Sequence, residues 1–146
     1  MILVLDTNVF VSAMRGRDRA PHELFTLWKN REIDLAFSPQ MLIELKRVFT
    51  YPKVQKLLGD VAPKVEMELD HLQRIAILTS GTVHVDVIQD DASDNMVLAC
   101  AKEAHADMIV SGDTKHVLPL RQFEGIPILS PAEAVRVLRR LKQRAA

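Results

Sequence analysis

Short apolar runs alternate along this chain with longer segments in which apolar residues recur at helical spacing. The apolar runs predict strands at 2–5, 33–37, 108–110 and 126–129, and amphipathic segments lie between them. Strands separated by helices are typical of crossover connections in a parallel sheet. The pattern therefore predicts an α/β fold with a central parallel sheet flanked by helices.

Local signals mark where several helices begin and end. The Ser-Pro pairs at 38–39 and 130–131 each combine a capping serine with a proline that suits the first helical turn. Tyr51-Pro52 breaks one helix, and Gly59 suits the end of the next. We expect helices at 7–14, 21–30, 39–49, 53–58, from 63 to about 76, after Asp94, near 115–118 and from 131 onward.

Two finer expectations concern the sheet. Residues 82–87 alternate between polar and apolar side chains, which predicts a further short strand. Pro127 has no backbone N–H to donate, so it predicts that strand 126–129 lies at an edge of the sheet.

The chain has 146 residues, 48% hydrophobic and 26% charged, which is the balance of a soluble globular protein. It shows no repeat, low-complexity segment or linker, so we expect a single domain spanning 1–146. No apolar run approaches the roughly 18 residues of a membrane span, and the start lacks a signal-peptide pattern. The single cysteine, Cys100, excludes an intramolecular disulfide and a multi-cysteine zinc site, and a reducing cytoplasm is the expected location.

The formal net charge is zero, so only the distribution of charge is informative. Basic residues cluster soon after residue 6 and along the C-terminal segment, whereas acidic residues gather between 86 and 94. A basic rim around an acidic centre suits a polyanion whose scissile phosphate is delivered to bound metals. For any one basic cluster, the alternative is a solvated helix face. The residues that we expect to contact the polyanion are Arg15, Arg17, Lys115, Arg139 and Arg140.

Three aspartates stand where predicted strands end or a helix begins. Asp6 closes the run 2–5, Asp113 follows the run 108–110, and Asp94 opens a helical segment. In a parallel α/β sheet such positions share one crevice. Carboxylates gathered there repel one another, so a hard cation that prefers oxygen ligands, Mg²⁺ or Mn²⁺, is the expected cofactor. Taken singly, each aspartate has an alternative role as a helix N-cap.

Glu44 is a fourth acidic candidate and lies in the middle of a predicted helix, among apolar residues. Its alternatives are exposure on a polar stripe or burial with a partner. With the three aspartates it completes a set in which metal-assisted hydrolysis is expected, with Asp6, Asp94 and Asp113 as metal ligands. Glu44 is then expected to hold a water or act as a general base.

Three neighbouring polar residues are candidates for supporting the acids. Asn8 and Ser111 can orient Asp6 and the substrate, although ordinary turn chemistry explains them equally well. Asp91, three residues before Asp94, either extends the site or lies in a solvated loop.

Three segments together resemble the PIN domain family. They are VLDTNVFVSA at 4–13, SPQMLIELKRVF at 38–49 and DDASDNMVLACAKEAHADMIVSGD at 90–113. The chain looks most like the bacterial and archaeal toxins of toxin–antitoxin pairs that are relatives of VapC. The resemblance implies a three-layer α/β/α fold, Mg²⁺- or Mn²⁺-dependent endoribonuclease activity, and dimerisation or inhibition by a small antitoxin. On the family's pattern, Asp6, Glu44, Asp94 and Asp113 occupy the four acidic positions.

One position departs from the pattern of many relatives. They carry another acid two residues after the aspartate of the GD pair, where this chain has Lys115. The resemblance then implies that one metal ion binds firmly and a second binds weakly.

Rival functions fit the sequence less well. A phosphatase of the haloacid-dehalogenase type needs a second acid two residues after the first, where Asn8 stands. A catalytically silent PIN scaffold that binds RNA or a protein remains the alternative, but such relatives usually lose one of the four acids. A purely structural domain leaves Glu44 unexplained. We therefore expect a metal-dependent ribonuclease acting on RNA, the toxin of a toxin–antitoxin pair and a homodimer.

Overall fold

The computed structural model describes residues 1–145. The strands are β1 (Ile2–Leu5), β2 (Asp34–Phe37), β3 (Ile77–Leu78), β4 (Met108–Val110), β5 (Gln122–Phe123) and β6 (Ile126–Leu129). The α-helices are α1 (Thr7–Arg15), α2 (Arg19–Lys29), α3 (Pro39–Val48), α4 (Pro52–Leu58), α5 (Ala62–Ile75), α6 (Ala92–Ala104) and α7 (Pro131–Ala145). Two short 3₁₀ helices are η1 (Gly59–Val61) and η2 (Leu118–Leu120).

The strands form one sheet in the order β3-β2-β1-β4-β6-β5. β1 pairs in parallel with both β2 and β4, and its last residue, Leu5, lies opposite Val110. β3 and β6 continue the parallel arrangement, while β5 alone is antiparallel, to β6. The carboxyl ends of β1 and β4 therefore meet side by side at the centre of one edge, where ligands bind in open α/β sheets.

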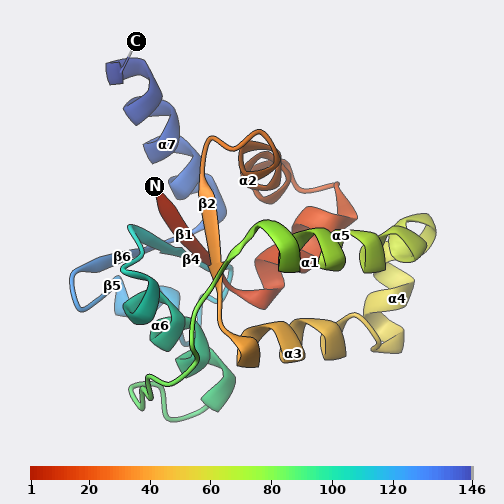
Figure 1. Cartoon of the computed structure of the whole chain (residues 1–146), viewed down its shortest axis with the longest axis horizontal. Coiled ribbons are helices and arrows are strands. Elements are labelled where there is room, and N and C mark those ends of the chain that lie inside the picture. Colours follow the sequence, from red (N-terminus) through yellow and green to blue (C-terminus); the bar gives the residue numbers. More distant parts are fainter. Residues whose placement is uncertain (146) are drawn as a thin grey trace.

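Helices cover both faces of this sheet, which confirms the expected α/β fold. α6 packs across β1, β2 and β4 on one face, whereas α1, α2 and α5 lie on the other (Figure 1). α7 packs against α2 and against β4 and β6. Within residues 1–145, every helix is too short or too polar to cross a membrane.

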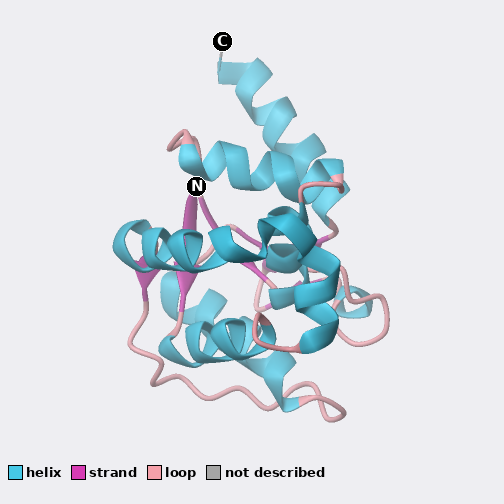
Figure 2. Ribbon diagram, turned by 90° about the vertical axis from the view of Figure 1, so that its right-hand side faces the viewer, coloured by secondary structure: helices cyan, strands magenta, loops and turns pink. Residues whose placement is uncertain are grey.

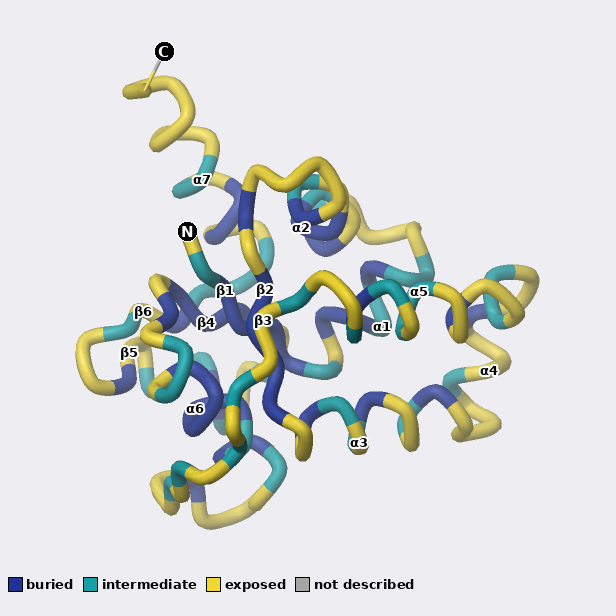
Figure 3. Tube along the Cα trace, in the orientation of Figure 1, coloured by how far each residue is buried: buried dark blue, intermediate teal, exposed yellow. Residues whose placement is uncertain are grey.

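The core lies between the sheet and the two helical layers, and buried positions concentrate along the central strands (Figure 3). Phe10 of α1 packs against Phe37 of β2 with ring centroids 4.8 Å apart. The rings of Phe25 and Trp28, both on α2, have centroids 5.1 Å apart. Burying each such ring contributes about 1.5–3 kcal/mol. Cys100 of α6 is fully buried, and this burial raises the pKa of its thiol to about 12.

The helix starts that the two Ser-Pro pairs predict are confirmed by capping contacts, whereas α2 and α6 each begin about two residues earlier than expected. The Ser38 hydroxyl accepts a hydrogen bond from the backbone N–H of Met41, 3.2 Å away, and so caps α3. Before α7, Ser130 and Glu133 each accept a bond from the other's backbone N–H at 3.2 Å, forming a capping box. The helix expected near 115–118 is wrong, because a turn there precedes η2.

Two expectations about the sheet are also wrong. Residues 82–87 form no strand, although exposure alternates along 82–86, and Figure 2 shows the stretch after β3 as a long loop. β6 is not an edge strand, since it lies between β4 and β5. Pro127 is tolerated because its neighbour Ile128 donates the backbone hydrogen bond, to Arg121 at 2.8 Å.

Side chains of α6, rather than a strand ladder, hold the loop between β3 and α6. Asn95, buried in the first turns of α6, accepts hydrogen bonds from the backbone N–H groups of Val87 and Ile88 at 3.0 and 2.8 Å. Its amide donates to the Ile88 carbonyl at 2.7 Å. Further along α6, the Glu103 carboxylate accepts from the N–H of Gly81 at 3.0 Å. These contacts fix the approach to the first turn of α6.

Replacing Asn95 by Ala removes all three of its hydrogen bonds and leaves backbone groups near Ile88 without partners. We expect the free energy of unfolding to fall by about 2–3 kcal/mol, as for other buried polar groups that lose their partners. Urea denaturation would measure the loss, and amide hydrogen exchange should quicken at residues 87–90. Asn30→Ala, the same change at an exposed position, is the control. Equal exchange rates in the two variants would contradict this role of Asn95.

Candidate functional site

Asp6 lies at the junction of β1 and α1 and is almost fully buried. Its carboxylate accepts hydrogen bonds from the Thr7 backbone N–H and the Ser111 hydroxyl, both at 2.8 Å, and from the Asn8 amide at 3.3 Å. Burial raises the pKa of Asp6, and the nearby charge of Asp113 raises it further against the lowering effect of these bonds. Asp6 therefore both caps α1 and presents a desolvated carboxylate at the strand ends.

Asn8 and Ser111 connect Asp6 to the loop that follows β4. Ser111 is fully buried, and its hydroxyl also accepts a bond from the Asp113 backbone N–H at 3.0 Å. The Asn8 carbonyl oxygen accepts from the Gly112 N–H, also at 3.0 Å. A Cβ at Gly112 would lie only 3.2 Å from that oxygen, so a larger residue would crowd this contact. The two side chains thus fix the turns after β1 and β4 relative to each other.

Asp94 lies in the first turn of α6 and is 7% exposed. Among residues 1–145 its Oδ2 has no hydrogen-bond partner, although this oxygen is buried. Burial first, and then the charges of Asp6, Asp91 and Asp113, raise the pKa of Asp94 to about 7. A helix N-terminus favours negative charge, so the position of Asp94 partly compensates this cost.

The sequence offered Asp94 as a possible N-cap of α6, but the residue that caps this helix is Asp91. Asp91 accepts hydrogen bonds from the backbone N–H and the hydroxyl of Ser93 at 3.0 and 2.6 Å, and these bonds lower the pKa of Asp91. Its exposed side chain is therefore occupied in starting the helix. The Asp-x-Ser spacing is a capping signal that the sequence already carried.

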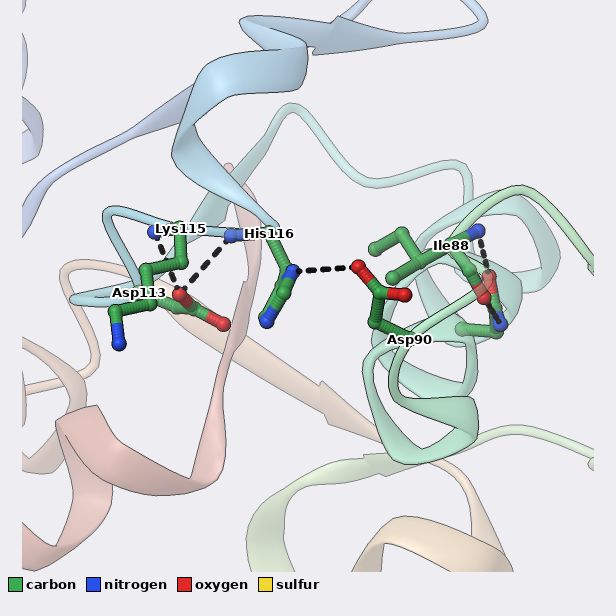
Figure 4. Close-up of polar contacts among 6 residues, drawn as sticks. Ile88, Asp90, Asp113, Lys115 and His116 are labelled. Carbon is green, nitrogen blue, oxygen red and sulfur yellow. Dashed lines mark hydrogen bonds and ion pairs between the residues drawn. The ribbon is translucent and has the colours of Figure 1, made fainter.

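Asp113 follows β4 and closes a tight turn. Its Oδ1 accepts hydrogen bonds from the backbone N–H groups of Lys115 at 2.8 Å and His116 at 3.1 Å. The His116 ring lies between Asp113 and Asp90, with Nδ1 3.7 Å from the Asp90 carboxylate (Figure 4). The Lys115 side chain is exposed beside this turn. The contact between His116 and Asp90 was not expected from the sequence, because the two residues lie far apart in the chain.

Glu44 lies on α3 and is half-buried. Burial, followed by the charge of Asp91, raises the pKa of Glu44; Arg47 lowers it and Asp6 raises it. The glutamate therefore shares one electrostatic environment with acids from β1 and α6. The structure brings the four acidic candidates from four separate segments toward the carboxyl ends of β1 and β4. We call this region, formed by Asp6, Glu44, Asp94 and Asp113, the acidic edge.

The donor chemistry of these acids suits a hard divalent cation. The available ligands are carboxylate oxygens, one of them buried without a partner, and their mutual repulsion would be relieved by positive charge. Within residues 1–145, however, no three Asp, Glu, His or Cys side chains are arranged closely enough to enclose an ion as they stand. Asp6 and Asp113 are each engaged in hydrogen bonds to their own turns. Metal binding would therefore require side-chain rotation.

The five basic candidates lie in three different regions. Arg15 and Arg17 line a hollow at the end of α1, whereas Lys115 lies beside Asp113. Arg139 is bound in a two-pronged ion pair to Glu23 of α2, with its Nη2 2.7 Å from the carboxylate. Arg140 is exposed on the same outer turns of α7, which extend beyond the amino end of β1 (Figure 1). Arg139 and Arg140 are thus not brought to the acidic edge.

The raised pKa of Asp94 predicts a specific pH dependence for the metal-free protein. Its carboxyl has a pKa of about 7 when folded and an ordinary value of 3.8 when unfolded, so the folded state binds the proton more strongly. Stability should therefore fall as the pH rises from about 4 to about 7 and then level off. In Asp94→Asn this fall should shrink, and the Tm near pH 8 should rise by about 3 °C, equivalent to ~1 kcal/mol.

Thermal unfolding in EDTA across this pH range would measure both effects. Asp70→Asn, which neutralises an exposed carboxylate on α5, is the matched control and should follow the unmodified protein. A pH profile of Asp94→Asn as steep as that of the control would show that Asp94 is not the titrating group.

Comparison with known proteins agrees with this architecture. A protein of Methanocaldococcus jannaschii, uncharacterized protein MJ1680, is 29% identical over 119 residues, which cover 82% of this chain and 74% of its own length. The fold is similar to a chain in the crystal structure of VapBC2 from Rickettsia felis bound to a DNA fragment from their promoter. The TM-score is 0.58 at 16% identity, covering 89% of this chain and 98% of the other. The family model described as PIN domain matches residues 2–115, and the chain therefore belongs to the PIN domain family.

Proposed function

We propose that this protein is a divalent-metal-dependent endoribonuclease. The observation that carries the proposal is the buried, unpartnered Oδ2 of Asp94, surrounded by the charges of Asp6, Asp91 and Asp113. Protein interiors rarely leave such an oxygen without a partner unless a ligand or ion serves it. Membership of the PIN domain family supports hydrolysis of a phosphodiester as the chemistry.

Asp6, Asp94 and Asp113 would hold Mg²⁺ or Mn²⁺. The ion would neutralise the phosphodiester and lower the pKa of an attacking water. Asn8 and Ser111 keep the Asp6 carboxylate oriented, because both hydrogen-bond to its Oδ2. Burial raises the pKa of Glu44, which makes its carboxylate a better acceptor for a proton from that water. Attack by water with departure of the 3′ oxygen leaves a 5′-phosphate and a 3′-hydroxyl.

The biological setting that we propose is a toxin–antitoxin pair in the cytoplasm. The similarity in fold to a chain of the VapBC2 complex supports a small protein partner. Apolar side chains are available for such a contact or for a homodimer, among them Met67 on α5 at 74% exposure and Ile43 on α3 at 60%. The nuclease proposal stands independently of this partner.

Cleavage of a mixed RNA pool in Mn²⁺, Mg²⁺ or EDTA tests the proposal. We expect cutting only with metal, and a loss of ~100-fold or more in Asp94→Asn, because metal assistance is worth several kcal/mol. Asp70→Asn should cut normally. A thermal-shift titration with Mn²⁺ should stabilise the control and not Asp94→Asn, which ties lost activity to lost metal binding. Cleavage of single-stranded DNA of the same sequences, measured in parallel, shows whether the protein prefers ribose or deoxyribose.

Two results would overturn the proposal. Cutting that persists in EDTA or in Asp94→Asn would come from a different site or a contaminant. No cutting by the folded protein with either metal would favour the silent scaffold that binds RNA or a protein.

A further inference from the structure

A second charged feature lies away from the acidic edge, where the end of α1 meets α4. Here the surface forms an open hollow of about 560 Å³. Four basic side chains line this hollow, against a single carboxylate, Asp60. We call it the basic hollow, and its four basic residues are Arg15, Arg17, Lys53 and Lys56.

What distinguishes these four cations is that they share one hollow, which contains a single carboxylate. Some lysines and arginines elsewhere are paired, as in Lys29 with Glu68, Lys142 with Glu32 and Arg139 with Glu23, whereas others in the described part of the chain remain exposed and unpaired. None of the ion pairs within residues 1–145 includes Arg15, Arg17, Lys53 or Lys56. The Nε of Arg15 is buried, and no hydrogen-bond acceptor within residues 1–145 contacts it. Four positive charges gathered against one negative charge favour an anionic ligand.

The helix α1 connects the acidic edge to the basic hollow. α1 starts directly after Asp6 and ends at Arg15, so nine residues of helical rise separate the two positions by about 14 Å. α3 contacts α1 and runs toward α4, as Figure 1 shows. Along α3, Glu44 is followed one turn later by Arg47, which is close enough to lower the pKa of Glu44. Charge therefore changes from negative to positive along both helices.

We propose that the basic hollow binds the phosphate backbone of the RNA strand a few nucleotides from the bond that is cut. This inference rests on the proposed function and adds a positioning surface to it. Lysine and arginine contacts to phosphate fix register without reading bases, so the hollow would hold RNA of any sequence. Its distance from the acids keeps the cations from competing with a metal for the same carboxylates.

The test measures RNA binding separately from cleavage. A labelled single-stranded RNA is titrated with protein carrying Asp94→Asn, and anisotropy is followed at salt concentrations between about 50 and 200 mM. In this background Lys53 and Lys56, both exposed on α4, are replaced together by Gln. The matched control replaces Arg140 and Arg144 of α7, also exposed, by Gln.

The α4 double variant should bind RNA roughly tenfold more weakly, with a salt slope shallower by about 1.4 for two lost phosphate contacts. The α7 double variant should stay within about twofold of the parent. In protein that retains Asp94, the α4 changes should raise KM and leave kcat unaltered. Circular dichroism would confirm that both variants are folded.

Several outcomes overturn the inference. One is an unchanged RNA affinity in the α4 variant. Another is an equal loss of RNA affinity in both variants, which would indicate diffuse electrostatic attraction. A third is a loss of RNA affinity confined to the α7 variant. Binding of an acidic peptide at the hollow with none of RNA would also overturn it. Protein that fails to cut RNA but binds it with the predicted dependence on Lys53 and Lys56 would refute the nuclease and keep the RNA-binding hollow.

Discussion

The hydrogen bond from Ser111 to Asp6 joins the two central strands where their ends meet. A single buried hydroxyl donates to the Asp6 carboxylate at 2.8 Å and accepts from the Asp113 backbone at 3.0 Å. It therefore ties an acid after β1 to an acid after β4. The register that places Leu5 opposite Val110 is what brings these residues together. Because neighbouring residues of a strand face opposite sides, a shift of one residue would separate the hydroxyl from the carboxylate.

Zero net charge conceals a division of the molecule into differently charged parts. The acids at the strand ends are crowded and carry raised pKa values at Asp6, Glu44 and Asp94. At the other end, α7 and the loop before β2 bring cations and acids into pairs such as Lys142 with Glu32. Exposed pairs of this kind add little to stability. Their larger effect is to reduce the positive charge of α7, of which Arg139 and Lys142 are paired in this way.

The sequence was sufficient for what depends on local pattern. Hydrophobic periodicity predicted the central parallel strands, and the Ser-Pro pairs predicted the starts of α3 and α7. Parallel topology then placed Asp6 and Asp113 at one edge without knowledge of their contacts.

Features that depend on partners distant in the chain could not be predicted. Residues 82–87 have the polar–apolar alternation of a strand. Backbone N–H groups at both ends of this stretch, however, donate to side chains of α6 and not to a neighbouring strand. Pro127 suggested an edge, yet the short β5 forms the edge beyond it. The basic hollow depends on α4 folding back toward the end of α1, and no local signal links Lys53 or Lys56 to Arg15.

The burial of Cys100 has a consequence for the chemical behaviour of the whole chain. A thiol reacts as its thiolate, and a pKa of about 12 leaves almost none of that form at neutral pH. With no surface exposure, the sulfur also cannot meet an oxidant or an alkylating reagent while α6 stays packed on the sheet. The thiol is therefore protected from oxidation while the protein stays folded. Its one cysteine becomes reactive only in molecules that open, so thiol labelling reports directly how often the layer formed by α6 separates from the strands.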